Sequence, residues 1–177
     1  SILSMLTRQL INVPVHLGLE HFPNIYCGVA VFLLIPLYVM CKKINAREKI
    51  GKCIILLIFL TAFNLNIPNY IWHGLHFPNS LPCRQSFIYI FFVLTMCFEA
   101  VYNIKELSNK QIGTSLWISI GLLVLFEQLF MAEGSSYSFK IAYVSGIFIL
   151  LYALFIFINN NAKLKICLLY TSDAADD

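Results

Sequence analysis

The sequence predicts an all-α fold, a polytopic bundle of transmembrane helices with about five spans. Of the 177 residues, 59% are hydrophobic and 12% are charged, whereas a typical soluble domain has about 25% charged residues. The apolar residues form continuous runs such as VAVFLLIPLYVM and IGLLVLF. Such runs exclude a disordered chain, and they lack the alternation of polar and apolar residues that a membrane β-barrel requires.

Five apolar segments have lengths near that of a bilayer-crossing helix. A helix of about 20 residues crosses a hydrocarbon core of about 30 Å, so we expect each segment to span the membrane, the second being short. Pro36 lies inside the first segment, where we expect a kink whose freed carbonyl a neighbouring helix satisfies. The segments are residues 25–41, 53–67, 87–104, 112–131 and 141–158.

The distribution of Lys and Arg predicts the orientation of these spans, because basic residues near span ends stay on the cytoplasmic side. Only Arg8, Arg84 and Lys140 lie on one side. The other nine lie on the opposite side: Lys42, Lys43, Arg47, Lys49, Lys52, Lys105, Lys110, Lys163 and Lys165. We therefore expect a multi-pass membrane protein. Its loops 42–52 and 105–111 are cytoplasmic, and loop 68–86 is extracytoplasmic, as are residues 1–24.

The last eleven residues, CLLYTSDAADD, differ sharply from the rest and contain every Asp of the chain. They resemble a translated sequencing adapter, so we expect residues 167–177 to be non-native. Residues 1–166 are then expected to be a partial integral-membrane domain. A genuine polar tail is the alternative.

The connection between the second and third segments, NIPNYIWHGLHFPNSLPCRQSF at residues 66–87, is unlike a simple linker. It holds Pro68, Pro78 and Pro82, three of the six prolines. Each proline fixes its own φ and favours an extended conformation in the residue before it, which predicts a shaped loop at the membrane surface. Shaped loops often carry function.

The run PNIYCG at residues 23–28 and the run NYIWHGLHFPNSLPCRQSFIYIFF at residues 69–92 resemble the YfhO-type bacterial membrane proteins. The resemblance covers most of residues 25–101 and implies a location in a bacterial plasma membrane. It implies similarity to polytopic GT-C-type glycosyltransferases, which transfer a sugar from a polyprenyl-phosphate donor to a cell-envelope polymer such as teichoic or lipoteichoic acid. The chain departs from the family pattern at Cys83 and Gln85, where aromatic residues are common. The acidic general base of such enzymes is expected upstream of Ser1, so the catalytic residue is unknown and the fragment alone is expected to be inactive.

Two residues of the loop are the main candidates for binding the donor. The planar guanidinium of Arg84 would suit the phosphate of a lipid-linked sugar, and an interfacial anchor that snorkels into the headgroups is the alternative. Trp72 would offer an apolar platform to a sugar face or a prenyl chain, although Trp is enriched at membrane interfaces in any case.

Other residues are expected to complete the substrate site. We expect His73 to bond substrate or loop carbonyls, Gly74 to allow close backbone approach, and Pro78 and Pro82 to shape the loop. Glu127, near the outer surface, would pair with Arg84 or line the donor cavity, because an ionisable residue within a span is a functional candidate.

No cofactor is identified from the sequence, and a divalent metal dependence stays open. His73 and His76 lack a carboxylate in the loop, so no metal site is expected. Glu99 lies near the cytoplasmic end of its span, where we expect a structural role. Beyond the bilayer, the expected partners are the polyprenyl-phosphate-linked sugar and the envelope polymer, and nucleic acid is not expected. Two alternative functions are a transporter or flippase component for lipid-linked sugars, with the loop as a gate, and a non-catalytic accessory membrane subunit.

Overall fold

The structure, a computed structural model, describes residues 6–11, 24–72, 74–75, 85–132 and 139–160. These residues form helices and connecting turns with no strand among them, which confirms the all-α prediction. The elements are η1 (Thr7–Gln9), α2 (Val31–Met40), α3 (Ala46–Asn64), α4 (Asn66–Trp72), α5 (Ser86–Tyr102), η2 (Ile104–Glu106), α6 (Asn109–Ala132) and α7 (Phe139–Asn160).

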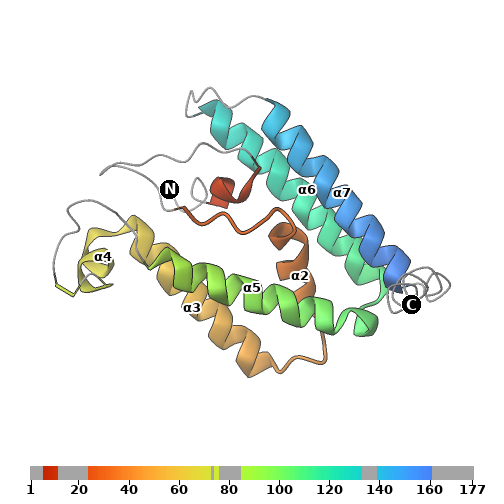
Figure 1. The fold of residues 1–177 in the computed structure, drawn as a ribbon, viewed down its shortest axis with the longest axis horizontal. Coiled ribbons are helices and arrows are strands. Elements are labelled where there is room, and N and C mark those ends of the chain that lie inside the picture. The colour runs from red at the N-terminus through yellow and green to blue at the C-terminus, as the bar shows by residue number, and fades with distance from the viewer. Residues whose placement is uncertain (1–5, 12–23, 73, 76–84, 133–138, 161–177) are drawn as a thin grey trace, which may run out of the picture.

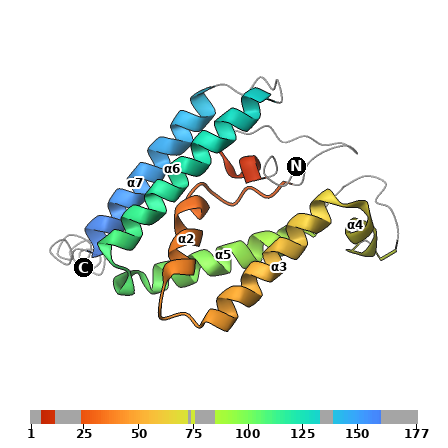
Figure 2. The same ribbon diagram turned by 180° about the vertical axis from the view of Figure 1, so that it is seen from behind.

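Two helix pairs are joined through a short central helix (Figures 1 and 2). Helices α6 and α7 lie side by side and run antiparallel, and α3 lies against α5. Helix α2 lies between the pairs and contacts α5, α6 and α7. The pairs meet where residues 41–45 link α2 to α3 and residues 103–108 link α5 to α6, which we call the joined end. They diverge toward α4 and the C-terminal end of α6, which we call the diverging end.

The five predicted spans correspond to α2, α3, α5, α6 and α7. The second differs in its bounds, because α3 covers Ala46–Asn64 where we expected residues 53–67, and the first differs most in length. Helix α2 has ten residues, about 15 Å at 1.5 Å per residue, or about half of a hydrocarbon core. We expected a helix from residue 25, but residues 24–30 are not helical. Gly28 has a φ of +104°, which lies outside the right-handed helical region, so the helix cannot extend back through it.

Among the described helices, the segment Lys140–Asn160 of α7 alone is both long and apolar enough to cross a membrane by length and composition. Val31–Met40 and Ser86–Tyr102 are apolar but shorter. The structure therefore confirms the helices of the predicted bundle but does not by itself confirm five spans.

The beginning of the expected loop at residues 66–87 is a helix. Helix α3 ends at Asn64, Leu65 is extended, and α4 then begins. Ile67, which we expected to be extended before Pro68, lies in α4. Pro68 occupies the first turn of α4, where a helix leaves its N–H groups without internal partners, so the missing N–H of proline costs nothing there.

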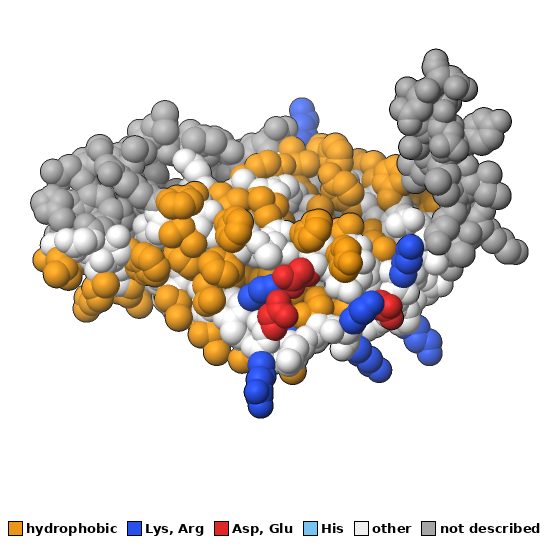
Figure 3. Space-filling model, turned by 60° about the horizontal axis from the view of Figure 1, so that its bottom comes forward, with side chains coloured by type: hydrophobic (Ala, Val, Ile, Leu, Met, Phe, Trp, Pro, Cys, Tyr) orange, Lys and Arg blue, Asp and Glu red, His pale blue; other side chains and the backbone are white. Residues whose placement is uncertain are grey.

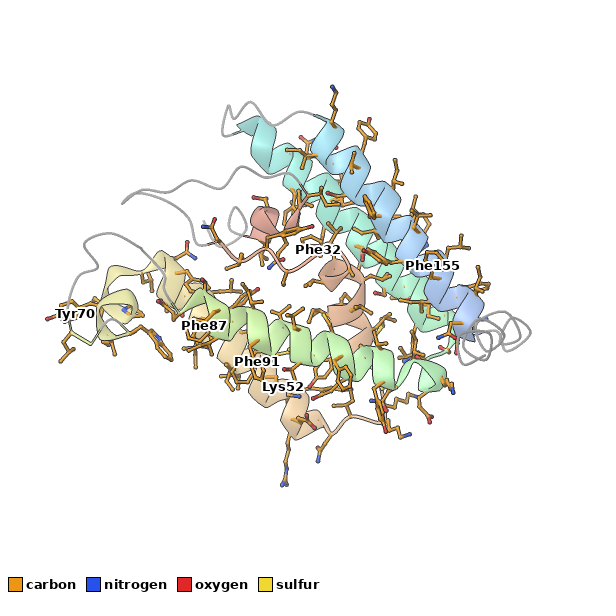
Figure 4. The ribbon with its side chains drawn as sticks, in the orientation of Figure 1. Phe32, Lys52, Tyr70, Phe87, Phe91 and Phe155 are labelled. Atoms are coloured by element: carbon orange, nitrogen blue, oxygen red, sulfur yellow. The ribbon has the colours of Figure 1, made fainter. Side chains whose placement is uncertain are left out.

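Burial is concentrated at α2 and is low on the outer faces. Leu33, Leu37 and Tyr38 of α2 are fully buried. On α7, Phe155 is 66% exposed and points away from α6, and Phe91 of α5 is similarly exposed (Figure 4). Soluble proteins rarely expose apolar surface on this scale, so the outer faces are suited to lipid.

Candidate functional site

The structure describes three of the seven predicted substrate-site residues. Trp72 and Gly74 lie at the end of α4, at the diverging end of the α3–α5 pair, and Glu127 lies on α6. Both ribbon views place α4 and the C-terminal end of α6 on different helix pairs, so the described part of the site is not one compact cluster (Figures 1 and 2). The other four residues, His73, Pro78, Pro82 and Arg84, lie outside the described residues.

Trp72 caps an aromatic cluster that joins three helices. Its ring centroid is 5.0 Å from that of Phe59 in α3. Phe59 lies 6.3 Å from Phe63, which meets Tyr89 of α5 edge-on at 5.8 Å. Trp72 is 44% exposed, whereas Phe59 and Tyr89 are buried. One face of the indole is thus held by protein while the rest of the ring stays available for another apolar surface.

Gly74 ends α4 in a left-handed conformation. Its φ is +68°, its N–H bonds the carbonyl of Ile71 at 3.1 Å, and the N–H of Leu75 bonds the carbonyl of Tyr70 at 3.0 Å. This pair of bonds is the Schellman arrangement that closes many helices, and glycine favours the left-handed position because it lacks a Cβ. A Cβ at Gly74 would meet nothing within 4 Å, so among the described atoms the glycine is explained by conformation rather than by crowding.

Glu127 lies in the last third of α6 and is partly buried. No salt bridge joins it to another charge among the residues that the structure describes. Its predicted pairing with Arg84 involves a residue outside the described ranges and stays a prediction.

A charged network at the joined end was not predicted. The ammonium of Lys52 bonds Glu48 at 2.7 Å, forms a second salt bridge with Glu99 of α5, and lies 5.5 Å from the ring centroid of Tyr38 in α2. The side chains of Lys52 and Glu99 are 15% and 25% exposed. Glu99 is a salt-bridge partner of Lys52, and the network ties α3 to α5 and α2. The structural role expected for Glu99 stays a prediction.

The network changes the pKa values of Lys52 and Glu48. Partial burial by itself would lower the pKa of Lys52, but hydrogen bonds to Glu48 and Glu99 outweigh it and raise that pKa above its usual range. The hydrogen bond from Lys52 and its positive charge lower the pKa of the Glu48 carboxyl. The spacing of four residues between Glu48 and Lys52 is a signal that sequence reasoning could have used.

Two serines of α6 hold α2 through its backbone. Ser119 donates to the carbonyl of Phe32 at 2.8 Å, and Ser115 donates to the carbonyl of Leu33 at 2.6 Å. Both serines are fully buried. The carbonyl of Phe32 is the one that the residue at position 36 would bond in an uninterrupted helix, and Pro36 has no N–H. A neighbouring helix thus satisfies the freed carbonyl, as we expected.

Gln9 stabilises the non-helical residues before α2. Its side-chain amide donates to the carbonyl of Ile25 at 2.5 Å, and its carbonyl oxygen accepts from the backbone N–H of Cys27 at 3.1 Å. Gln9 is 1% exposed. Its side chain thus satisfies one backbone carbonyl and one backbone N–H of the non-helical segment.

Comparison with known proteins gives one match. The family model of the bacterial membrane protein YfhO matches residues 2–172. No curated protein and no solved structure matches the chain. Because the family model covers nearly all of the sequence, it confirms the resemblance seen in the runs at residues 23–28 and 69–92. The chain belongs to the YfhO family of bacterial membrane proteins.

Proposed function

We propose that this chain is part of a membrane glycosyltransferase that transfers a sugar from a polyprenyl-phosphate donor to a cell-envelope polymer at the extracytoplasmic face. The observation that carries the proposal is the half-exposed ring of Trp72, which is held on an aromatic cluster at the start of the connection that carries Arg84. A sugar linked to a phosphate and a long prenyl chain requires an apolar platform and a cationic group, and Trp72 and Arg84 belong to the same connection in the sequence. Membership of the YfhO family supports the same reading.

The residues are assigned separate parts in this proposal. Arg84 binds the donor phosphate and stabilises the negative charge that grows on the leaving group. Trp72 contacts the sugar face or the first prenyl units, and His73 bonds the sugar. Glu127 lines the donor cavity from the other helix pair. No residue of this chain is assigned as the general base that activates the acceptor hydroxyl.

The proposed topology has five crossings, with the joined end in the cytoplasm and the diverging end outside. Support comes from the basic residues at the joined end and from the exposed apolar faces of α5 and α7. The first crossing combines α2 with the non-helical residues 24–30. Irregular backbone at membrane depth is tolerated where protein satisfies its polar groups, and Gln9 supplies two such bonds.

The test compares the sugar content of purified envelope polymers, by mass spectrometry, in the source bacterium with and without the parent gene. Complementation uses wild type, Arg84→Ala, Arg84→Lys and, as a control at the other arginine on the same side, Arg8→Ala. We expect one sugar to disappear without the gene and to return with wild type and Arg8→Ala. Arg84→Ala should not restore the sugar even though the protein is present at normal abundance. Arg84→Lys should restore transfer only in part, because lysine cannot bind a phosphate with two parallel bonds.

Other outcomes identify the alternative functions. Accumulation of lipid-linked sugar on the cytoplasmic side, with transfer itself intact in isolated membranes, would indicate a flippase component and contradict the transferase proposal. An unchanged sugar profile would contradict both and leave an accessory role. Loss of protein abundance in Arg84→Ala would assign Arg84 to structure.

A further inference from the structure

A groove of about 520 Å³ follows the outer face of α3 near the joined end. Val39 of α2 forms part of one wall, and the rest comes from residues of α3 that include Lys49, Ile50, Cys53 and Leu57. The α3 residues recur at spacings of three and four, so they form a single stripe along the helix. The buried Phe59, which packs in the cluster around Tyr89, belongs to another face of α3.

The walls of the groove are apolar, and the described part of the chain leaves them uncovered. Ile50 is 59% exposed, Ile54 is 53% exposed and Leu57 is 63% exposed. From Ala46 to Leu57 the stripe rises about 16 Å at 1.5 Å per residue, which is close to half of a hydrocarbon core of about 30 Å. The groove therefore has the length of one leaflet.

One end of the groove is cationic. Arg47 lies in the first turn of α3 and is exposed, and Lys42 is exposed in the preceding turn. Lys49 is the one of these three basic residues that lines the groove, and its ammonium donates to the carbonyl of Val39 at 2.8 Å and to that of Cys41. Figure 3 shows Lys and Arg side chains, with acidic side chains among them, at the border of a broad hydrophobic surface.

The nearest carboxylate does not cancel this charge within the groove. At 100° per residue, Glu48 is directed to the side of α3 opposite the stripe. It bonds Lys52, whose other partner is Glu99 of α5. Glu48 is exposed, but its partner is Lys52 rather than a residue of the groove.

We propose that this groove binds an anionic phospholipid of the leaflet at the joined end. One acyl chain lies on the stripe from Ile50 to Leu57, and the phosphate contacts Arg47 and Lys42. An apolar groove of one leaflet's length with a cationic end fits an anionic headgroup and its chain better than it fits a second apolar helix, which has no use for the cationic end. The proposal is independent of sugar transfer, because the groove lies on a different face of α3 from Phe59, the residue that contacts Trp72.

The test is native mass spectrometry of the full chain, purified from membranes that contain phosphatidylglycerol and phosphatidylcholine in equal amounts. Ile50→Trp fills the groove, and Ile147→Trp on α7 is its control, because Ile147 is 57% exposed and lies outside the groove. Arg47→Gln removes one headgroup contact, and Lys110→Gln is its control at an exposed lysine of the same end.

We expect wild type and both controls to retain phosphatidylglycerol and not phosphatidylcholine. Retention should fall about fivefold in Arg47→Gln, the loss expected for one basic residue at an anionic surface, and should disappear in Ile50→Trp. Retention of both lipids to the same degree in all five proteins would overturn the proposal. Retention of no lipid, or a dimer that Ile50→Trp abolishes, would overturn it too, and the dimer would identify the groove as a contact between copies.

A second measurement needs no substitution. Cys53 lines the groove and is exposed, whereas Cys41 and Cys97 are buried. We expect phosphatidylglycerol added to the delipidated full chain to slow alkylation of Cys53, read by peptide mass spectrometry, while phosphatidylcholine leaves the rate unchanged. Equal protection by the two lipids would contradict a selective site.

Discussion

The hydroxyl of Ser119 lies 2.8 Å from the carbonyl oxygen of Phe32 and donates a hydrogen bond to it across the contact between α6 and α2. Pro36 creates the need for this bond, since it cannot donate to the carbonyl four residues before it. Pro36 of α2 and Ser119 of α6 therefore act together, although they lie more than eighty positions apart in the chain.

The first prediction is an energetic coupling between these two positions. Ser119→Ala should lower the free energy of unfolding by about 1–2 kcal/mol, because it leaves a buried carbonyl poorly satisfied. In a Pro36→Ala background the helix can supply its own donor, so Ser119→Ala should cost clearly less. Unfolding of the four proteins in mixed micelles gives the coupling.

The control for this cycle is Thr114→Ala, because the hydroxyl of Thr114 bonds the carbonyl of Lys110 within α6 and is exposed. It should show no coupling to Pro36→Ala. If Ser119→Ala lowers the free energy of unfolding equally in both backgrounds, Ser119 does not compensate for the N–H that Pro36 lacks.

The second prediction concerns the pH dependence that Lys52 confers. Its pKa is raised in the folded protein by the two carboxylates, so its contribution to stability is fully present below the unfolded value of about 10.4. That contribution is lost as the pH rises from there through the folded pKa. The stability advantage of wild type over Lys52→Met should thus be constant from about pH 7 to 10 and should shrink above about pH 10.4.

Thermal unfolding of both proteins across this range makes the comparison, with Lys105→Met as the control at an exposed lysine. An advantage that declines steadily between pH 7 and 9 would contradict the raised pKa. A Lys105→Met protein that behaves like Lys52→Met would show that net charge, rather than the network, sets the pH response.

The third prediction separates two reasons for glycine at position 74. The left-handed φ of +68° should make Gly74→Ala cost about 1 kcal/mol of stability, whereas Gly74→Asn should cost less because asparagine tolerates that conformation. If conformation is the whole reason, sugar transfer by Gly74→Asn should stay near wild type. Loss of transfer in a stable Gly74→Asn protein would instead support close approach of the substrate to the backbone.

The fourth prediction concerns Trp72. Trp72→Ala should reduce sugar transfer at least about tenfold, as expected for loss of roughly 1.4 kcal/mol of stacking and burial, and Trp72→Phe should retain most of it. Phe63→Ala disrupts the same aromatic cluster by removing the ring that packs against Phe59 and Tyr89. It should lower stability and leave transfer per folded molecule intact. Equal loss of transfer in both alanine variants would assign Trp72 to structure.

Much of the helical architecture follows from local features of the sequence. The apolar run at residues 87–104 becomes α5 at Ser86–Tyr102, and the run at 141–158 becomes α7 at Phe139–Asn160. Hydrophobicity and length suffice in these two cases because no proline or glycine of unusual conformation interrupts the run. The first predicted span fails on this point, since Gly28 adopts a positive φ and shortens the helix to Val31–Met40.

The candidate site was less predictable, because its contacts join residues that are distant in the chain. The identity of Trp72 and Gly74 as end-of-helix residues is local, but the contact of Trp72 with Phe59 depends on α4 folding back on α3. The network of Lys52 is similar: its bond to Glu48 is inherent in a spacing of four residues, whereas its bond to Glu99 exists only because α5 lies against α3.

By itself the sequence determined that the protein is helical and apolar and that it belongs to the YfhO family. It also determined that the carbonyl left without a donor by Pro36 needs a hydrogen bond from elsewhere in the protein. The hydrophobic period, the length of each apolar run and its composition are properties of short segments, so they are evident from the sequence alone. The tertiary structure decided that Ser119 donates that hydrogen bond, that Gln9 bonds the backbone before α2, and that Glu99 forms a salt bridge with Lys52. These choices depend on which helices meet, and that is set by the packing of whole faces rather than by any one segment.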